Sequence, residues 1–128
     1  MWPFNFLLIV WSVTAVASGL SHFFLPAWTA AGTVWPTSAG WQSEVAYFNL
    51  LVAAAFTAIA RSSDMQLKRT ATLAIAALSL VLGVHHLQGW MTEPRLFHII
   101  FTVANFSAAL WAAGCLVYAG GERKNRVD

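Results

Sequence analysis

The chain has 128 residues, of which 59% are hydrophobic and only 9% are charged. A soluble domain carries about 25% charged residues to cover its surface, so this composition excludes an ordinary soluble fold. The net charge of +2 does not indicate nucleic-acid binding, because the basic residues gather in two short segments next to apolar stretches. We expect the lipid bilayer as the surroundings and no nucleic-acid partner.

Four stretches are long and apolar enough to cross a membrane as helices. A span needs about 20 apolar residues, within a range of about 17–25. Residues 1–43 contain no charged side chain, and further uncharged stretches cover residues 45–60, 70–92 and 96–121. The stretch 45–60 is marginal in length until Gln42 and Ser43 are added. The sequence therefore predicts one all-α domain over residues 1–128, an integral membrane four-helix bundle with antiparallel up-down order. The predicted spans cover about residues 5–25, 43–61, 71–90 and 96–119.

Local signals predict where these helices begin and end. Pro26 ends the first span, and a long polar and aromatic loop follows it. Ser43 is the expected N-cap of the second span. Asp64 and Lys68 are expected to pair one helical turn apart. The segment Thr92-Glu93-Pro94 is typical of a helix start and should open the fourth span.

The basic residues predict the orientation in the membrane. Those between the second and third spans and those after the fourth lie on one side, and the other side keeps only Arg95, next to Glu93. Lys and Arg are enriched in cytoplasmic segments. We therefore expect a multi-pass protein of the cell inner membrane or plasma membrane, with both termini cytoplasmic. The residues that carry this prediction are Arg61, Lys68, Arg69, Arg123, Lys124 and Arg126.

All four histidines lie toward the predicted outer ends of the spans. His22 is near the end of the first span, His85 and His86 near the end of the third, and His98 near the start of the fourth. Helical spacing places three of them on polar stripes, whereas His85 is rotated about 100° away from His86. Lipid cannot satisfy polar groups, so the stripes should face the bundle interior. We expect a polar pocket in the outer half, with Glu44 at its mouth, lined by His22, Gln42, Asn49, His86, His98 and Asn105.

The occupant of this pocket stays open at this point. Ionisable side chains inside a membrane suggest a functional site. Haem could be held by His22 and His86 from opposite sides, and a metal ion by these two with His98, although neither has diagnostic spacing. A small organic ligand, such as a quinone-like headgroup, fits the outer half equally well. The leading expectation is a membrane protein that binds a small ligand there, and the alternative for each histidine is hydrogen bonding between helices.

The stretch from Gly19 to Ala60 carries a resemblance to a known group. Its residues are Gly19-Leu20-Ser21-His22-Phe23-Phe24-Leu25-Pro26, then Trp41-Gln42-Ser43-Glu44-Val45, then Asn49-Leu50. This pattern resembles an uncharacterised family of small four-helix bacterial membrane proteins. The resemblance covers about a third of the chain. It implies the four-helix fold and draws attention to His22, Gln42, Glu44 and Asn49, but it implies no reaction.

A weak internal repeat relates the two halves of the chain. The segment Gly19-Leu20-Ser21-His22 resembles Gly83-Val84-His85-His86, and Asn49 has a counterpart in Asn105. Both matches run in the same direction across the membrane, so a pseudo-axis would lie along the membrane normal. The sequence leaves open whether the two hairpins are related.

Two rival functions belong to other classes. The chain could be an accessory or structural subunit of a larger membrane complex, such as a respiratory or photosynthetic assembly, or form a homo-oligomer. The short loops and many large aromatic side chains suit such packing. It could also be a membrane-embedded isomerase that transfers protons through Glu44 and a histidine. The sequence does not decide whether the protein is an enzyme.

Overall fold

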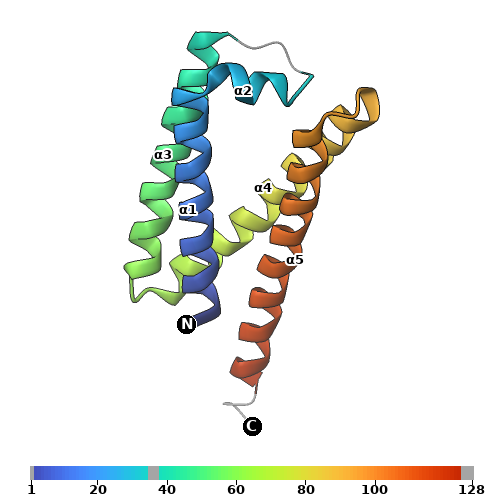
Figure 1. The fold of residues 1–128 in the computed structure, drawn as a ribbon. Helices are drawn as coiled ribbons and strands as arrows, with labels where there is room; N and C mark the ends of the chain where they lie inside the picture. Colours follow the sequence, from blue (N-terminus) through green and yellow to red (C-terminus); the bar gives the residue numbers. More distant parts are fainter. Residues whose placement is uncertain (1, 35–37, 125–128) are drawn as a thin grey trace.

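The computed structural model describes residues 2–34 and 38–124, with side chains up to residue 118 (Figure 1). Of the residues that carry the predicted orientation, Arg126 lies outside the described residues, and the side chains of Arg123 and Lys124 lie outside the described side chains. The described elements are α1 (Trp2–Phe24), α2 (Pro26–Ala31), α3 (Ala39–Arg61), α4 (Met65–Thr92) and α5 (Leu96–Lys124). Every helix except α2 is long and apolar enough to cross a membrane. The all-helical class and the four apolar helices predicted from the sequence are thus confirmed.

The start of α3 differs from its prediction. Its N-cap is Ser38 and not Ser43, because the Ser38 hydroxyl accepts a hydrogen bond from the backbone N–H of Trp41 at 3.2 Å. The hydroxyl of Ser43 instead donates to the Ala39 carbonyl at 3.1 Å, inside the helix. The region predicted as one long loop also contains α2, which Pro26 opens at its first helical position.

Two other local predictions are also wrong. Asp64 does not pair with Lys68, because its carboxylate caps α4 by accepting the backbone N–H groups of Gln66 and Leu67 at 2.8 and 3.1 Å. Thr92 does not open a helix but ends α4, where its hydroxyl donates to the Gln88 carbonyl at 3.0 Å.

The long helices pack as two antiparallel pairs, α1 with α3 and α4 with α5, and contacts within each pair far exceed those between pairs (Figure 1). Glycines allow the close approach within each pair. A Cβ on Gly19 would lie 3.1 Å from the Ala46 carbonyl oxygen of α3, and one on Gly83 would lie 3.0 Å from the Phe106 ring of α5. Small residues at helix contacts are the usual packing device where lipid removes any hydrophobic drive between helices.

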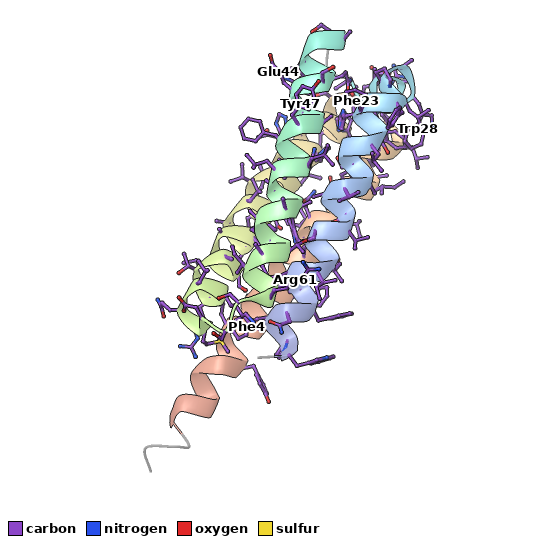
Figure 2. All side chains as sticks on the ribbon, turned by 90° about the vertical axis from the view of Figure 1, so that its left-hand side faces the viewer. Phe4, Phe23, Trp28, Glu44, Tyr47 and Arg61 are labelled. Carbon is purple, nitrogen blue, oxygen red and sulfur yellow. The ribbon has the colours of Figure 1, made fainter. Side chains whose placement is uncertain are left out.

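The two ends of the structure differ in chemistry. The basic end holds the start of α1 and the turn between α3 and α4; the histidine end holds α2 and the turn between α4 and α5. Figure 2 shows Phe4 and Arg61 at the basic end and Trp28 and Glu44 at the histidine end. The buried apolar core lies toward the basic end, where all four long helices contribute Phe4, Leu7, Leu8, Ala60, Ala71, Ile75, Ala112 and Cys115.

The two pairs bury equivalent positions. The buried residues Phe4, Leu7, Leu8, Ala15 and Gly19 of α1 recur 64 positions later as the buried residues Lys68, Ala71, Thr72, Ser79 and Gly83 of α4. Gln42, Ala46 and Ala53 of α3 recur 56 positions later as His98, Thr102 and Ala109 of α5, all buried. The same two spacings relate His22 to His86 and Asn49 to Asn105. The second pair therefore repeats the packing register of the first.

Cys115 provides a test of the core. Its side chain is 4% exposed and is the one cysteine of the chain. Because buried thiols react slowly, we expect little labelling of the detergent-solubilised protein by N-ethylmaleimide until it is unfolded. A Ser63→Cys variant supplies an internal control, since Ser63 is exposed in the turn before α4 and should take up one label rapidly. Rapid labelling of Cys115 in the folded protein would show that the core is open.

Candidate functional site

The first polar contact at the histidine end joins α1, α2 and α3. His22 near the end of α1 bonds through Nδ1 to the side-chain oxygen of Gln42 in α3. The hydroxyl of Thr29 in α2 lies within hydrogen-bonding distance of the same oxygen, at 3.2 Å, and of the Pro26 carbonyl oxygen, at 2.9 Å. Gln42 is buried, and the ring of Trp41 stands edge-on to the His22 imidazole with centroids 6.5 Å apart. We call His22 and Gln42 the first couple.

This contact determines where the proton of His22 lies. A carboxamide oxygen can only accept a hydrogen bond, so Nδ1 of His22 is the donor and carries the ring proton. In the neutral imidazole Nε2 is then left with a lone pair. His22 is half-buried, so this nitrogen is an acceptor site at the edge of the first pair.

The second couple consists of His86 in α4 and His98 in α5. Their Nδ1 atoms lie 3.3 Å apart, and the backbone N–H of Val34, which follows α2, donates to Nε2 of His98 at 3.1 Å. His98 has no exposed surface. The ring of Phe101 packs against His86 with centroids 5.0 Å apart. A histidine couple thus connects the second pair to the segment between α1 and α3.

The protons of the second couple follow from the same reasoning. His98 accepts through Nε2, so its proton in the neutral ring lies on Nδ1 and is donated to His86. Nδ1 of His86 is then the acceptor, and its proton lies on Nε2. A chain of hydrogen bonds therefore runs from the Val34 N–H through His98 to His86.

Close packing around His98 holds this arrangement. A Cβ on Gly89 would lie 2.5 Å from Cε1 and 2.7 Å from Nδ1 of the His98 ring, so only glycine leaves room for the imidazole. Trp28 of α2 packs against Phe97 with ring centroids 4.5 Å apart. Arg95 forms an ion pair with Glu93 at 2.6 Å, in the turn between α4 and α5 at the same end of the structure.

The couples occupy equivalent places in the two pairs. His22 corresponds to His86 and Gln42 to His98 in the repeated register. In each pair a histidine near the end of one helix bonds to a polar side chain near the start of its partner. Each couple also bonds to the segment that follows α1, through Thr29 in the first and Val34 in the second.

The remaining predicted site residues do not join either couple. Asn49 donates to the Val45 carbonyl at 3.0 Å and Asn105 to the Phe101 carbonyl at 2.8 Å, each within its own helix. Glu44 is exposed on α3 (Figure 2). The expected single polar interior is therefore divided into two couples. Among the described residues, no group of three or more His, Cys, Asp or Glu side chains is close enough to hold a metal ion.

Sequence reasoning missed the role of the segment between α1 and α3. Neither Thr29 nor Val34 stood out, because a backbone N–H has no sequence signal and a single threonine in a loop has many uses. Pro26, three residues before Thr29, is typical of the first position of a helix. It could have indicated the short helix α2, which carries the Thr29 hydroxyl.

Comparison of the chain with protein-family models, with curated proteins and with solved structures found no match.

Proposed function

We propose that the protein is a small polytopic membrane protein that binds a small, largely apolar ligand at the histidine end. The observation that carries this proposal is the pair of equivalent histidine couples, both bonded to the segment between α1 and α3. Intramembrane ionisable groups are costly to bury and commonly mark functional sites. His22 and His86 are such groups, and they lie at equivalent positions at the same end of the structure. Hydrogen bonding between helices does not require an ionisable side chain at either position.

The hydrogen-bonding polarity of the couples favours a ligand with a neutral polar headgroup. Nε2 of His22 is an acceptor and would receive an O–H or N–H group from the ligand. A quinol-type ring, which carries hydroxyl groups on an apolar ring, meets this requirement, and the surrounding aromatic side chains suit its apolar part.

Ligand release from the membrane-extracted protein tests this proposal. Native mass spectrometry of the gently extracted protein should show a reproducible added mass, which a His22→Leu/His86→Leu double variant loses. His85→Leu is the matched control, because His85 is exposed beside His86 and should leave the added mass unchanged. An unchanged mass in the double variant would refute the proposal. The size of the mass distinguishes an organic ligand from haem or a metal ion.

A role as an accessory or structural subunit of a larger membrane complex is the second candidate. The observation that favours it is the limited contact between the two pairs, together with large exposed side chains on α3 such as Tyr47, Phe48 and Leu51. Release with other polypeptides in fixed ratio, without a small added mass, would favour this candidate, and release as a homo-oligomer would indicate a second copy as the partner. The isomerase interpretation has no geometric support, since no hydrogen bond joins Glu44 to a described histidine.

We further propose the orientation that the basic residues predict, with the basic end in the cytoplasm of the inner or plasma membrane. Arg61, Lys68 and Arg69 all lie at this end, as does the start of α1. A fluorescent protein fused after Asp128 should therefore fluoresce, and alkaline phosphatase fused there should be inactive in a bacterial host. The same reporters inserted in the turn at residues 93–95 should give the opposite result. Phosphatase activity at the C-terminus would reverse the assignment.

A further inference from the structure

An open groove runs along the outer surface of the first pair, toward the basic end. It has a volume of about 470 Å³, within the range of about 300–1,000 Å³ of small-molecule sites. Val16 of α1 forms one wall, and α3 provides the rest through Leu50, Ala53, Ala54, Thr57, Ala58 and Arg61. It lies well away from both histidine couples, so it is separate from the ligand site proposed above.

The shape of the groove follows from the helical spacing of α3. Its lining residues recur at intervals of three and four and therefore share one face. Leu50 stands at one end and Arg61 at the other, with small side chains between them. At 1.5 Å per residue, the distance from Leu50 to Arg61 is about 16 Å. The hydrocarbon core of a bilayer is ~30 Å thick, so this length matches the hydrocarbon part of one leaflet.

The groove ends on a cation that pairs with no acidic side chain among those that the structure describes. Arg61 lies in the last turn of α3 and is exposed, and no hydrogen bond or ion pair joins it to another described side chain. Asp64 is the one acid at this end whose side chain the structure describes, and its carboxylate caps α4. The other acids with described side chains, Glu44 and Glu93, lie at the histidine end.

We propose that this groove binds an anionic phospholipid. One acyl chain lies along the alanine face of α3 against Val16, and the headgroup phosphate pairs with Arg61, whose planar guanidinium suits a phosphate. Charge complementarity selects a lipid over a second copy of this chain. Among the side chains that the structure describes, a copy inserted in the same orientation would bring no acid to this level other than the capped Asp64.

Lipid retention in native mass spectrometry tests the proposal. The delipidated full-length protein is titrated in detergent with palmitoyl-oleoyl phosphatidylglycerol or with the phosphatidylcholine of the same chains. We expect one tightly held phosphatidylglycerol, and Arg61→Gln should weaken its retention about five-fold while Arg61→Lys largely restores it, since one basic side chain contributes about 1 kcal/mol. Arg95→Gln, at the opposite end, is the matched charge control and should leave retention unchanged.

The groove itself is tested by filling it. Ala54→Phe should reduce the retention of both lipids, whereas Ala55→Phe, one position along and exposed outside the groove, should not. Equal phosphatidylglycerol retention in the parent and in Arg61→Gln would overturn the proposal, and this variant keeps the helix core intact. A change from dimer to monomer in Ala54→Phe, with lipid retention unaltered, would also overturn it and identify a second copy as the occupant.

Discussion

Gly89→Ala should destabilise the protein by about 1–3 kcal/mol, the range for adding a methyl group to a fully packed site. The added Cβ would lie 2.5–2.8 Å from three atoms of the His98 ring. The ring cannot move without cost, because it is fully buried and bonded both to the Val34 N–H and to His86. The free energy of unfolding, measured by sodium dodecyl sulfate titration in mixed micelles, checks this result.

Gly114→Ala is the matched control in the neighbouring helix. A Cβ at Gly114 would meet no atom within 4 Å, and replacing glycine by alanine inside a helix stabilises it by about 0.5–1 kcal/mol. The same substitution should therefore change stability in opposite directions at the two positions. Stabilisation by Gly89→Ala would mean that His98 does not occupy the space against α4. The second couple, and the ligand site proposed on it, would then need revision.

The fold could be predicted from composition and hydropathy because membrane helices are determined by long apolar stretches. Four uncharged segments gave four long helices, as expected. The residues at which the helices begin and end were predicted poorly, because each helix end depends on a single side chain that has several possible partners. Ser38 and Ser43 are both plausible N-caps, and the structure shows that Ser38 is the one used, so that α3 begins before Trp41.

The end of the structure that holds the candidate site could be predicted from the sequence, but the contacts between its side chains could not. The positions of His22, His86 and His98 along their spans placed them at one end, but these positions do not show which side chains meet. Packing in pairs divided the expected interior, so that His22 meets Gln42 and His86 meets His98. Asn49 satisfied its donor within its own helix, a local alternative that periodicity cannot exclude.

Lys68 is a further residue whose surroundings could not be predicted from the sequence. In the sequence it was one of several basic residues that set the orientation, and such residues are usually solvated. In the structure it is 1% exposed and occupies the place that Phe4 takes in the first pair. Its ammonium group donates to Oδ1 of Asn5 at 2.5 Å. A position that is apolar in one half of the repeat is thus charged in the other.

Asn5→Leu should cost about 1.5–3 kcal/mol of unfolding free energy, the usual worth of a hydrogen bond to a charged group. The variant leaves the Lys68 ammonium buried without its amide acceptor. Asn49→Leu is the control, since that amide bonds within its own helix and should cost less.

A double-mutant cycle separates the contact from the burial of the charge. Lys68→Met keeps most of the side-chain volume and removes the ammonium group, so the Asn5→Leu/Lys68→Met double variant should recover much of the loss caused by Asn5→Leu alone. Additive losses in the cycle would show that Asn5 and Lys68 do not interact. A coupling of 1 kcal/mol or more, a size typical of residues in contact, would establish that this buried pair joins α1 to α4 at the basic end, where the two helix pairs meet.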